Sequence, residues 1–165
     1  MNSDFKKVQA NVEAAYFSAA DPIDRADILA LFSRADCPES LEFLTQRIAE
    51  AASGKLTCYE LWGLATALAG KLVERYPERV LELLCVLLQA LGNESGLDKQ
   101  GFAIAANGLA RFATSSVITS PDVAAAYAKA LDQLTVSYRR HHVDDQDETC
   151  WNTIRNLTSI PEVKS

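Results

Sequence analysis

The residues best suited to chemistry are two adjacent histidines that precede an acidic run. His141 and His142 are the only histidines in the 165-residue chain. The acids that follow them are Asp144, Asp145, Asp147 and Glu148. Imidazole and carboxylate groups are ligands for zinc and calcium. However, adjacent residues of a helix point in different directions, and the acidic run lacks the glycine and ligand spacing of a calcium loop. We therefore expect a solvated loop between two helices here, and no metal site.

Cysteine is a second candidate for chemistry. The four cysteines are Cys37, Cys58, Cys85 and Cys150. None forms a Cys-x-x-Cys pair, and their spacing matches no zinc pattern. Because the first residues include no apolar signal-peptide core, we expect a cytoplasmic protein with reduced thiols. Buried structural cysteine is the favoured interpretation, and a catalytic thiol is the alternative.

Other catalytic arrangements are missing from the sequence. There is no Gly-x-Ser-x-Gly, no His-Glu-x-x-His and no phosphate-binding glycine loop. Glu78 and Glu82 lie one helical turn apart, so they could form an acid–base pair. A carboxylate at a helix start next to a solvated one is the commoner meaning of this spacing. We predict a protein that is not an enzyme and has no cofactor.

Composition narrows the class of partner. Hydrophobic residues make up 48% and charged residues 23%, which is typical of a folded soluble domain. We expect one domain over residues 1–165. The net charge of −6 disfavours nucleic acid as a partner and favours a basic protein. No run of about 18 apolar residues exists, so no membrane span is expected.

Alanine and leucine dominate the chain, and both favour helix. We predict an all-α fold of about eight helices. Thr57 and Glu60 have the spacing of a capping box at the start of the fourth helix. The predicted helices cover about residues 4–19, a segment beginning at Pro22, and then 38–52, 57–75, 77–92, 98–113, 121–138 and 145–157.

A proline followed by an acid recurs about every 40 residues. Proline suits the first turn of a helix, and an acid after it faces the positive end of the helix dipole. When the helix beginning at Pro77 is shifted by 44 residues, Gln89 falls on Gln133. The pattern predicts a repeated helical hairpin, and the last Pro-acid pair is expected to end the final helix instead. The four pairs are Pro38-Glu39, Pro77-Glu78, Pro121-Asp122 and Pro161-Glu162.

This period, with two helices in each unit, resembles the HEAT and armadillo class of α-solenoids. The resemblance covers about residues 22–137. It implies antiparallel helical hairpins stacked into a right-handed superhelix. A compact helical bundle is the alternative.

Stacked units would place equivalent acids in one row. Such a row favours a cationic protein partner, although helix-dipole complementation alone also explains the acids at helix starts. We expect a protein-binding function, most specifically a bacterial immunity protein that neutralises a basic nuclease toxin. A HEAT-like scaffold or adaptor subunit is the alternative, and a HEAT-like DNA glycosylase is disfavoured by the acidity. The predicted partner-binding residues are Glu39, Glu42, Glu78, Glu82, Asp122 and Asp132, with Asp144, Asp145, Asp147 and Glu148.

Overall fold

The computed structural model describes residues 4–93, 104–106, 108–109 and 120–142, and these residues contain helices and no strands. The all-α prediction is therefore confirmed for this part of the chain. Residues 104–106 and 108–109 are also helical, and the helix expected over 145–157 lies outside the described residues. The elements are α1 (Asp4–Ser18), α2 (Pro22–Ala30), the 3₁₀ helix η1 (Leu31–Arg34), α3 (Pro38–Ala52), α4 (Cys58–Leu68), α5 (Leu72–Arg75), α6 (Pro77–Asn93) and α8 (Pro121–His142).

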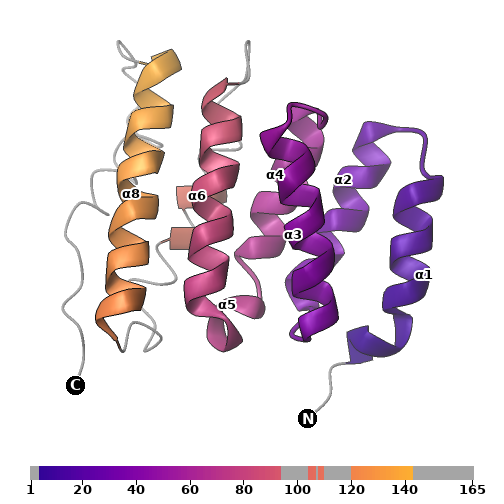
Figure 1. Ribbon diagram of the computed structural model, residues 1–165. Helices are drawn as coiled ribbons and strands as arrows, with labels where there is room; N and C mark the ends of the chain where they lie inside the picture. The colour runs from indigo at the N-terminus through magenta and orange to yellow at the C-terminus, as the bar shows by residue number, and fades with distance from the viewer. Residues whose placement is uncertain (1–3, 94–103, 107, 110–119, 143–165) are drawn as a thin grey trace.

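The helices that begin with Pro-acid pack side by side. Helix α6 contacts α3 on one side and α8 on the other, while α2 packs against α4 (Figure 1). Helices α6 and α8 run parallel, because Gln89 donates a hydrogen bond to Gln133 over 3.3 Å and Gly92 lies against Ser137. The Gln89–Gln133 contact joins the two positions that the 44-residue shift aligns.

Three helix starts follow local sequence signals. The carboxylate of Asp21 accepts a hydrogen bond from the N–H of Ile23 at 2.8 Å, and this caps α2. The hydroxyl of Ser120 accepts from the N–H of Val123 at 3.2 Å, and this caps α8. Helix α3 has its proline, Pro38, in the first turn. The predicted starts at Pro22, Pro38, Pro77 and Pro121 are confirmed, and Pro161 lies outside the described residues.

Helix α6 lies at the centre of the described core. It also contacts α4 and α5. Its polar side chains Glu78, Glu82 and Gln89 remain exposed, so one narrow stripe faces solvent. Its buried residues are Val80, Leu81, Leu83, Leu84, Cys85, Leu87, Leu88 and Leu91.

The prediction of one helix over 57–75 is wrong. A turn at 69–71 separates α4 from α5. At this turn the N–H of Lys71 donates to the carbonyl of Ser33 over 3.0 Å. A Cβ on Gly70 would lie 2.1 Å from that carbonyl oxygen. Only glycine permits this approach, which joins the end of α4 to η1.

Two other local predictions are also wrong. Thr57 precedes α4 but makes no capping hydrogen bond with its side chain. Glu60 is buried, at 2% exposure, and pairs with Arg25 of α2 instead of reaching back to the helix start. At the other end of the chain, α8 continues to His142, so the histidines lie in the last helical turn and not in a loop.

Candidate functional site

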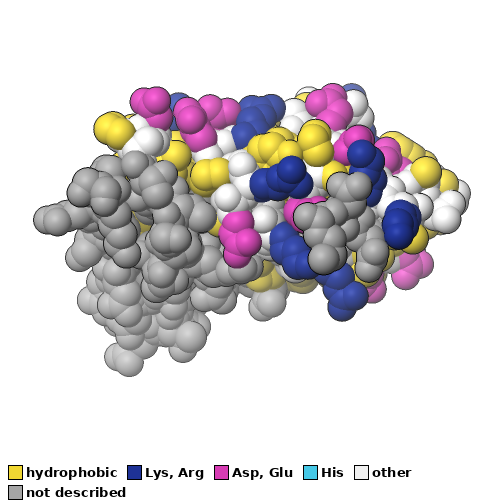
Figure 2. All heavy atoms as spheres, turned by 90° about the horizontal axis from the view of Figure 1, so that it is seen from below, with side chains coloured by type: hydrophobic (Ala, Val, Ile, Leu, Met, Phe, Trp, Pro, Cys, Tyr) yellow, Lys and Arg dark blue, Asp and Glu magenta, His cyan; other side chains and the backbone are white. Residues whose placement is uncertain are grey.

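Three of the predicted acids, Glu78, Glu82 and Asp122, lie at the end of the molecule where α6 and α8 begin. Glu78 and Asp122 occupy the first turns of α6 and α8. Glu82 lies one turn further along α6. All three side chains are exposed. We call Glu78, Glu82 and Asp122 the acidic edge. Figure 2 views this end of the molecule and shows acidic side chains gathered over α6 and α8.

An open hollow of about 380 Å³ lies beside the acidic edge. Both carboxylates of α6 line it, and Val123 brings the first turn of α8 to its wall. Tyr76 and Pro77 add apolar surface to its lining. The hollow therefore has the size of a small binding pocket and a strongly charged rim. Its lining residues are Arg75, Tyr76, Pro77, Glu78, Arg79, Glu82 and Val123.

The acids of this region differ in how far they are already neutralised. Glu82 pairs with Arg79 over 3.0 Å, and both side chains are about half exposed. Glu78 and Asp122 have no ion pair within the described part of the chain. Exposed pairs contribute about 0–1 kcal/mol, so a partner's cation can replace Arg79 at small cost. The acidic edge therefore offers its charge to an incoming cation.

The acids of α3 are less available. The carboxylate of Glu39 lies 3.3 Å from the ammonium of Lys6. The pKa of Glu39 is lowered by a hydrogen bond from its own backbone N–H, and then by its bond with Lys6. Glu42 is exposed and accepts a hydrogen bond from Gln46. That Glu39 and Glu42 contact a partner stays a prediction. Lys6 partly neutralises the charge of Glu39 within the chain.

Asp132 lies away from the acidic edge. It is exposed on α8, ten residues beyond Asp122, which is about 15 Å along a helix. It raises the pKa of Cys85, although burial of the thiol is the larger cause. The remaining predicted acids, Asp144, Asp145, Asp147 and Glu148, lie outside the described residues.

Sequence reasoning missed the basic residues that surround the acidic edge. Lys71, Arg75 and Arg79 recur every four residues, which is the spacing that could have identified them. Arg34 of η1 is joined to this group through its neighbours. The N–H of Lys71 donates to Ser33, and the guanidinium of Arg75 donates to the carbonyl of Asp36 at 3.2 Å. The end of the molecule thus carries both signs of charge.

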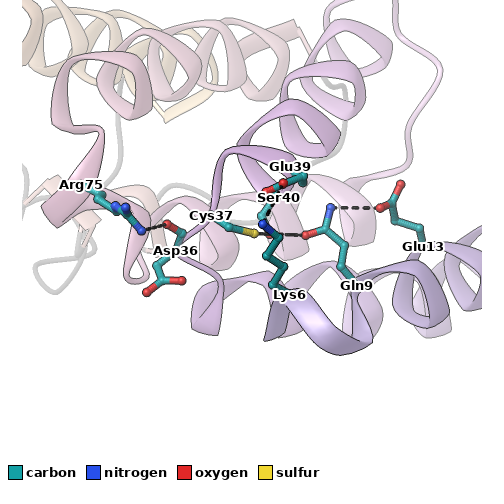
Figure 3. A network of polar contacts seen from close by, with 8 residues as sticks. All are labelled: Lys6, Gln9, Glu13, Asp36, Cys37, Glu39, Ser40 and Arg75. Atoms are coloured by element: carbon teal, nitrogen blue, oxygen red, sulfur yellow. Dashed lines mark hydrogen bonds and ion pairs between the residues drawn. The ribbon is translucent and has the colours of Figure 1, made fainter. Parts of the chain in front are cut away.

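A polar network fastens α1 to the start of α3 (Figure 3). Gln9 is 5% exposed, and its side-chain oxygen accepts hydrogen bonds from Ser40 and Cys37. Its amide group donates to Glu13 at 3.0 Å. The side-chain oxygen and the amide group of Gln9 both have partners, and the Cys37 thiol is buried. The Oδ1 atom of Asp36, which Figure 3 draws in the same network, is buried and has no hydrogen-bond partner among the described residues. We interpret the network as structural. Cys37 and Cys85 are buried as expected, whereas Cys58 is only partly buried and Cys150 lies outside the described residues.

The most buried charges lie between α1, α2, α3 and α4. Arg25 donates to Glu60 through Nε and Nη2, over 3.0 and 2.9 Å. The guanidinium of Arg47 lies 4.9 Å from the ring centre of Phe17 and 4.7 Å from that of Phe43. Burial, followed by the charge of Glu60, raises the pKa of Tyr16 to about 12. These contacts join α2 to α4 and α1 to α3, so they hold the helices together.

The described residues contain no group of three or more His, Cys, Asp or Glu side chains placed to hold a metal ion. None of the described helices is both long and apolar enough to cross a membrane. No family model, curated protein or solved structure matches this chain.

Proposed function

We propose that this protein works without catalysis, by binding a protein partner at the end where α6 and α8 begin. The observation that carries the proposal is the hollow of about 380 Å³, which brings Glu78 and Glu82 together beside the first turn of α8. An exposed carboxylate with no cation of its own attracts a cationic group and speeds association. A lysine or arginine of the partner enters the hollow and pairs with Glu78.

The parallel packing supports a repeat architecture for the scaffold. The turn that follows α4 contacts η1 through Gly70 and Ser33, and α6 contacts α8 through Gly92 and Ser137. We propose that the units stack as in an α-solenoid of the HEAT class. Such stacking presents the first turns of successive helices along one border, which is a common use of solenoids in recognition.

The most specific role that we propose is that of an immunity protein bound to a basic toxin, such as a nuclease. The small size, the net charge of −6 and the exposed acidic edge support it. A scaffold or adaptor subunit is the second candidate, and the stacked helices favour it. The neighbouring reading frame separates the two, because an immunity gene accompanies its toxin gene.

Capture from the native host tests the proposal. Tagged wild type is compared with Glu78→Lys/Asp122→Lys and with the control Asp24→Lys/Asp27→Lys, which reverses two exposed acids on α2. We expect a stoichiometric basic protein with the wild type and the control, and at least a tenfold loss with the acidic-edge variant. Equal recovery with all three proteins, or no stoichiometric partner, would refute the proposal. Circular dichroism checks that each variant is folded.

For the immunity role, the captured partner is expressed in a sensitive host. Co-expression of the wild type should restore growth, and the acidic-edge variant should not. A partner that is harmless when expressed alone would eliminate the immunity role and favour the scaffold.

A further inference from the structure

Four exposed basic residues form a continuous group across the same end of the molecule. They are Arg34, Lys71, Arg75 and Arg79, which we call the basic band. Two hydrogen bonds, from Lys71 to Ser33 and from Arg75 to Asp36, hold residues 33–36 against residues 71–75. Arg75 and Arg79 line one hollow. Figure 2 shows Lys and Arg side chains following each other across the middle of this end.

Two members of the basic band are not neutralised. Arg79 pairs with Glu82, and Arg75 donates to a backbone carbonyl. Within the described part of the chain, the side chains of Arg34 and Lys71 make no ion pair or hydrogen bond. Among the described residues, the band therefore presents the unpaired charges of Arg34 and Lys71 at the same end as the unpaired charges of Glu78 and Asp122.

We propose that the binding partner presents a bipolar surface, with carboxylates opposite the basic band and cations opposite the acidic edge. This inference rests on the proposed function and adds the second half of the partner's chemistry. A partner with both signs of charge can dock in only one orientation, because a half turn would place like charges together. The basic band and the acidic edge meet at the hollow, which has Arg75 and Arg79 as well as Glu78 and Glu82 in its lining.

The partner at the basic band is an acidic protein segment and not a nucleic acid. Glu74 and Glu78 are exposed beside the band, and the chain carries a net charge of −6. A run of phosphates longer than the band would meet these carboxylates and be repelled. A few separated carboxylates on a folded partner can contact the four cations and avoid the acids.

Peptide titrations followed by ¹⁵N-edited NMR test the inference without the natural partner. The probes are hexaglutamate and hexalysine at about 10 mM salt, where the attraction between charges extends over roughly 30 Å before salt screens it. We expect hexaglutamate to shift the amide signals of residues 33–36 and 71–76. Hexalysine should shift those of residues 78–82, 120, 122 and 123.

Charge reversal locates the two responses. The variant Arg34→Glu/Lys71→Glu should weaken hexaglutamate binding at least tenfold and should not weaken hexalysine binding. The control Lys55→Glu/Lys129→Glu makes the same change in net charge at exposed positions outside the band, and it should change hexaglutamate binding less than twofold. Equal weakening by both variants would overturn the inference, because net charge alone would then explain the result.

Each remaining outcome has its own meaning. If hexaglutamate shifts no signals in the band, the bipolar surface is refuted and the proposed function remains. If hexalysine shifts no signals at the acidic edge, the proposed function itself is contradicted. If a 12-base-pair DNA duplex binds the band more tightly than hexaglutamate does, the acidic protein segment is the wrong ligand.

Discussion

Replacing Gly70 with alanine tests the contact that interrupts the expected helix over 57–75. The new Cβ would lie 2.1 Å from the carbonyl oxygen of Ser33 and 2.5 Å from its Cα. Both neighbours are backbone atoms, so no side chain can rotate away. The end of α4 must move from η1, which weakens the 3.0 Å hydrogen bond from Lys71 to Ser33.

The magnitude combines three terms. Overpacking costs about 1–3 kcal/mol, and weakening the hydrogen bond adds about 1 kcal/mol. Alanine also lowers the conformational entropy of the unfolded chain, which stabilises the folded state by about 0.4–1 kcal/mol. We therefore expect Gly70→Ala to lower the free energy of unfolding by about 1–4 kcal/mol. For a chain of this length that corresponds to a fall in Tm of roughly 2–16 °C.

Urea denaturation followed by circular dichroism at 222 nm measures this loss. Gly54→Ala is the matched control, because its Cβ would meet nothing within 4 Å and only its φ of +74° is unfavourable. We expect about 1 kcal/mol for the control. A loss at Gly70 no larger than that at Gly54 would refute the claim that the approach to Ser33 requires glycine.

Three further predictions concern packing and charge. Arg25→Ala leaves the buried carboxylate of Glu60 without its partner, so it should lower the free energy of unfolding, measured by urea denaturation, by about 3 kcal/mol. The double variant Arg25→Met/Glu60→Leu should recover most of this stability. An equal loss in the double variant would argue against a charge effect. The raised pKa of Tyr16, about 12, means that the folded state keeps a proton which the unfolded state loses near pH 10. Stability should therefore fall by about 2–3 kcal/mol between pH 10 and 12, and Tyr16→Phe should reduce this fall; an identical pH profile for the variant would contradict the assignment. Gly92→Ala places a Cβ 2.9 Å from the Cβ of Ser137, so it should lower the free energy of unfolding by about 1–3 kcal/mol. The loss should be smaller when Ser137→Gly is also present. Strictly additive effects in this double-mutant cycle would argue against the contact.

The helix starts could be predicted from sequence because their causes are local. Asp21 and Ser120 cap helices whose first N–H groups lie two or three residues away. The prolines add a second local signal. The alignment of Gln89 with Gln133 also anticipated a real contact, because equivalent residues of parallel neighbours meet.

The failures come from tertiary contacts that local rules do not include. Glu60 has the spacing for a cap, but it lies close to Arg25 of another helix, and the ion pair prevails. Gly70 lies within the helix expected over 57–75, and its close approach to the backbone of Ser33 occurs where that helix is interrupted. The acids of the candidate site were recognisable as helix-start residues. The basic band was not, since Arg34 joins Lys71 only through the fold.

The parallel contacts between neighbouring helices also bear on the order of folding. Arg25 and Glu60 are separated by 35 residues, and Gln89 and Gln133 by 44. In the described residues, α1 packs on α2 and α3, and α8 packs on α6, so no pairing of the two outermost helices has to form early. Neighbouring helices therefore meet after loop closures of similar length, and contacts between elements near in sequence form faster than contacts between distant ones. We expect structure to appear first around α4 and α6 and to extend outward, so pulsed hydrogen exchange should protect the amides of α6 before those of α1.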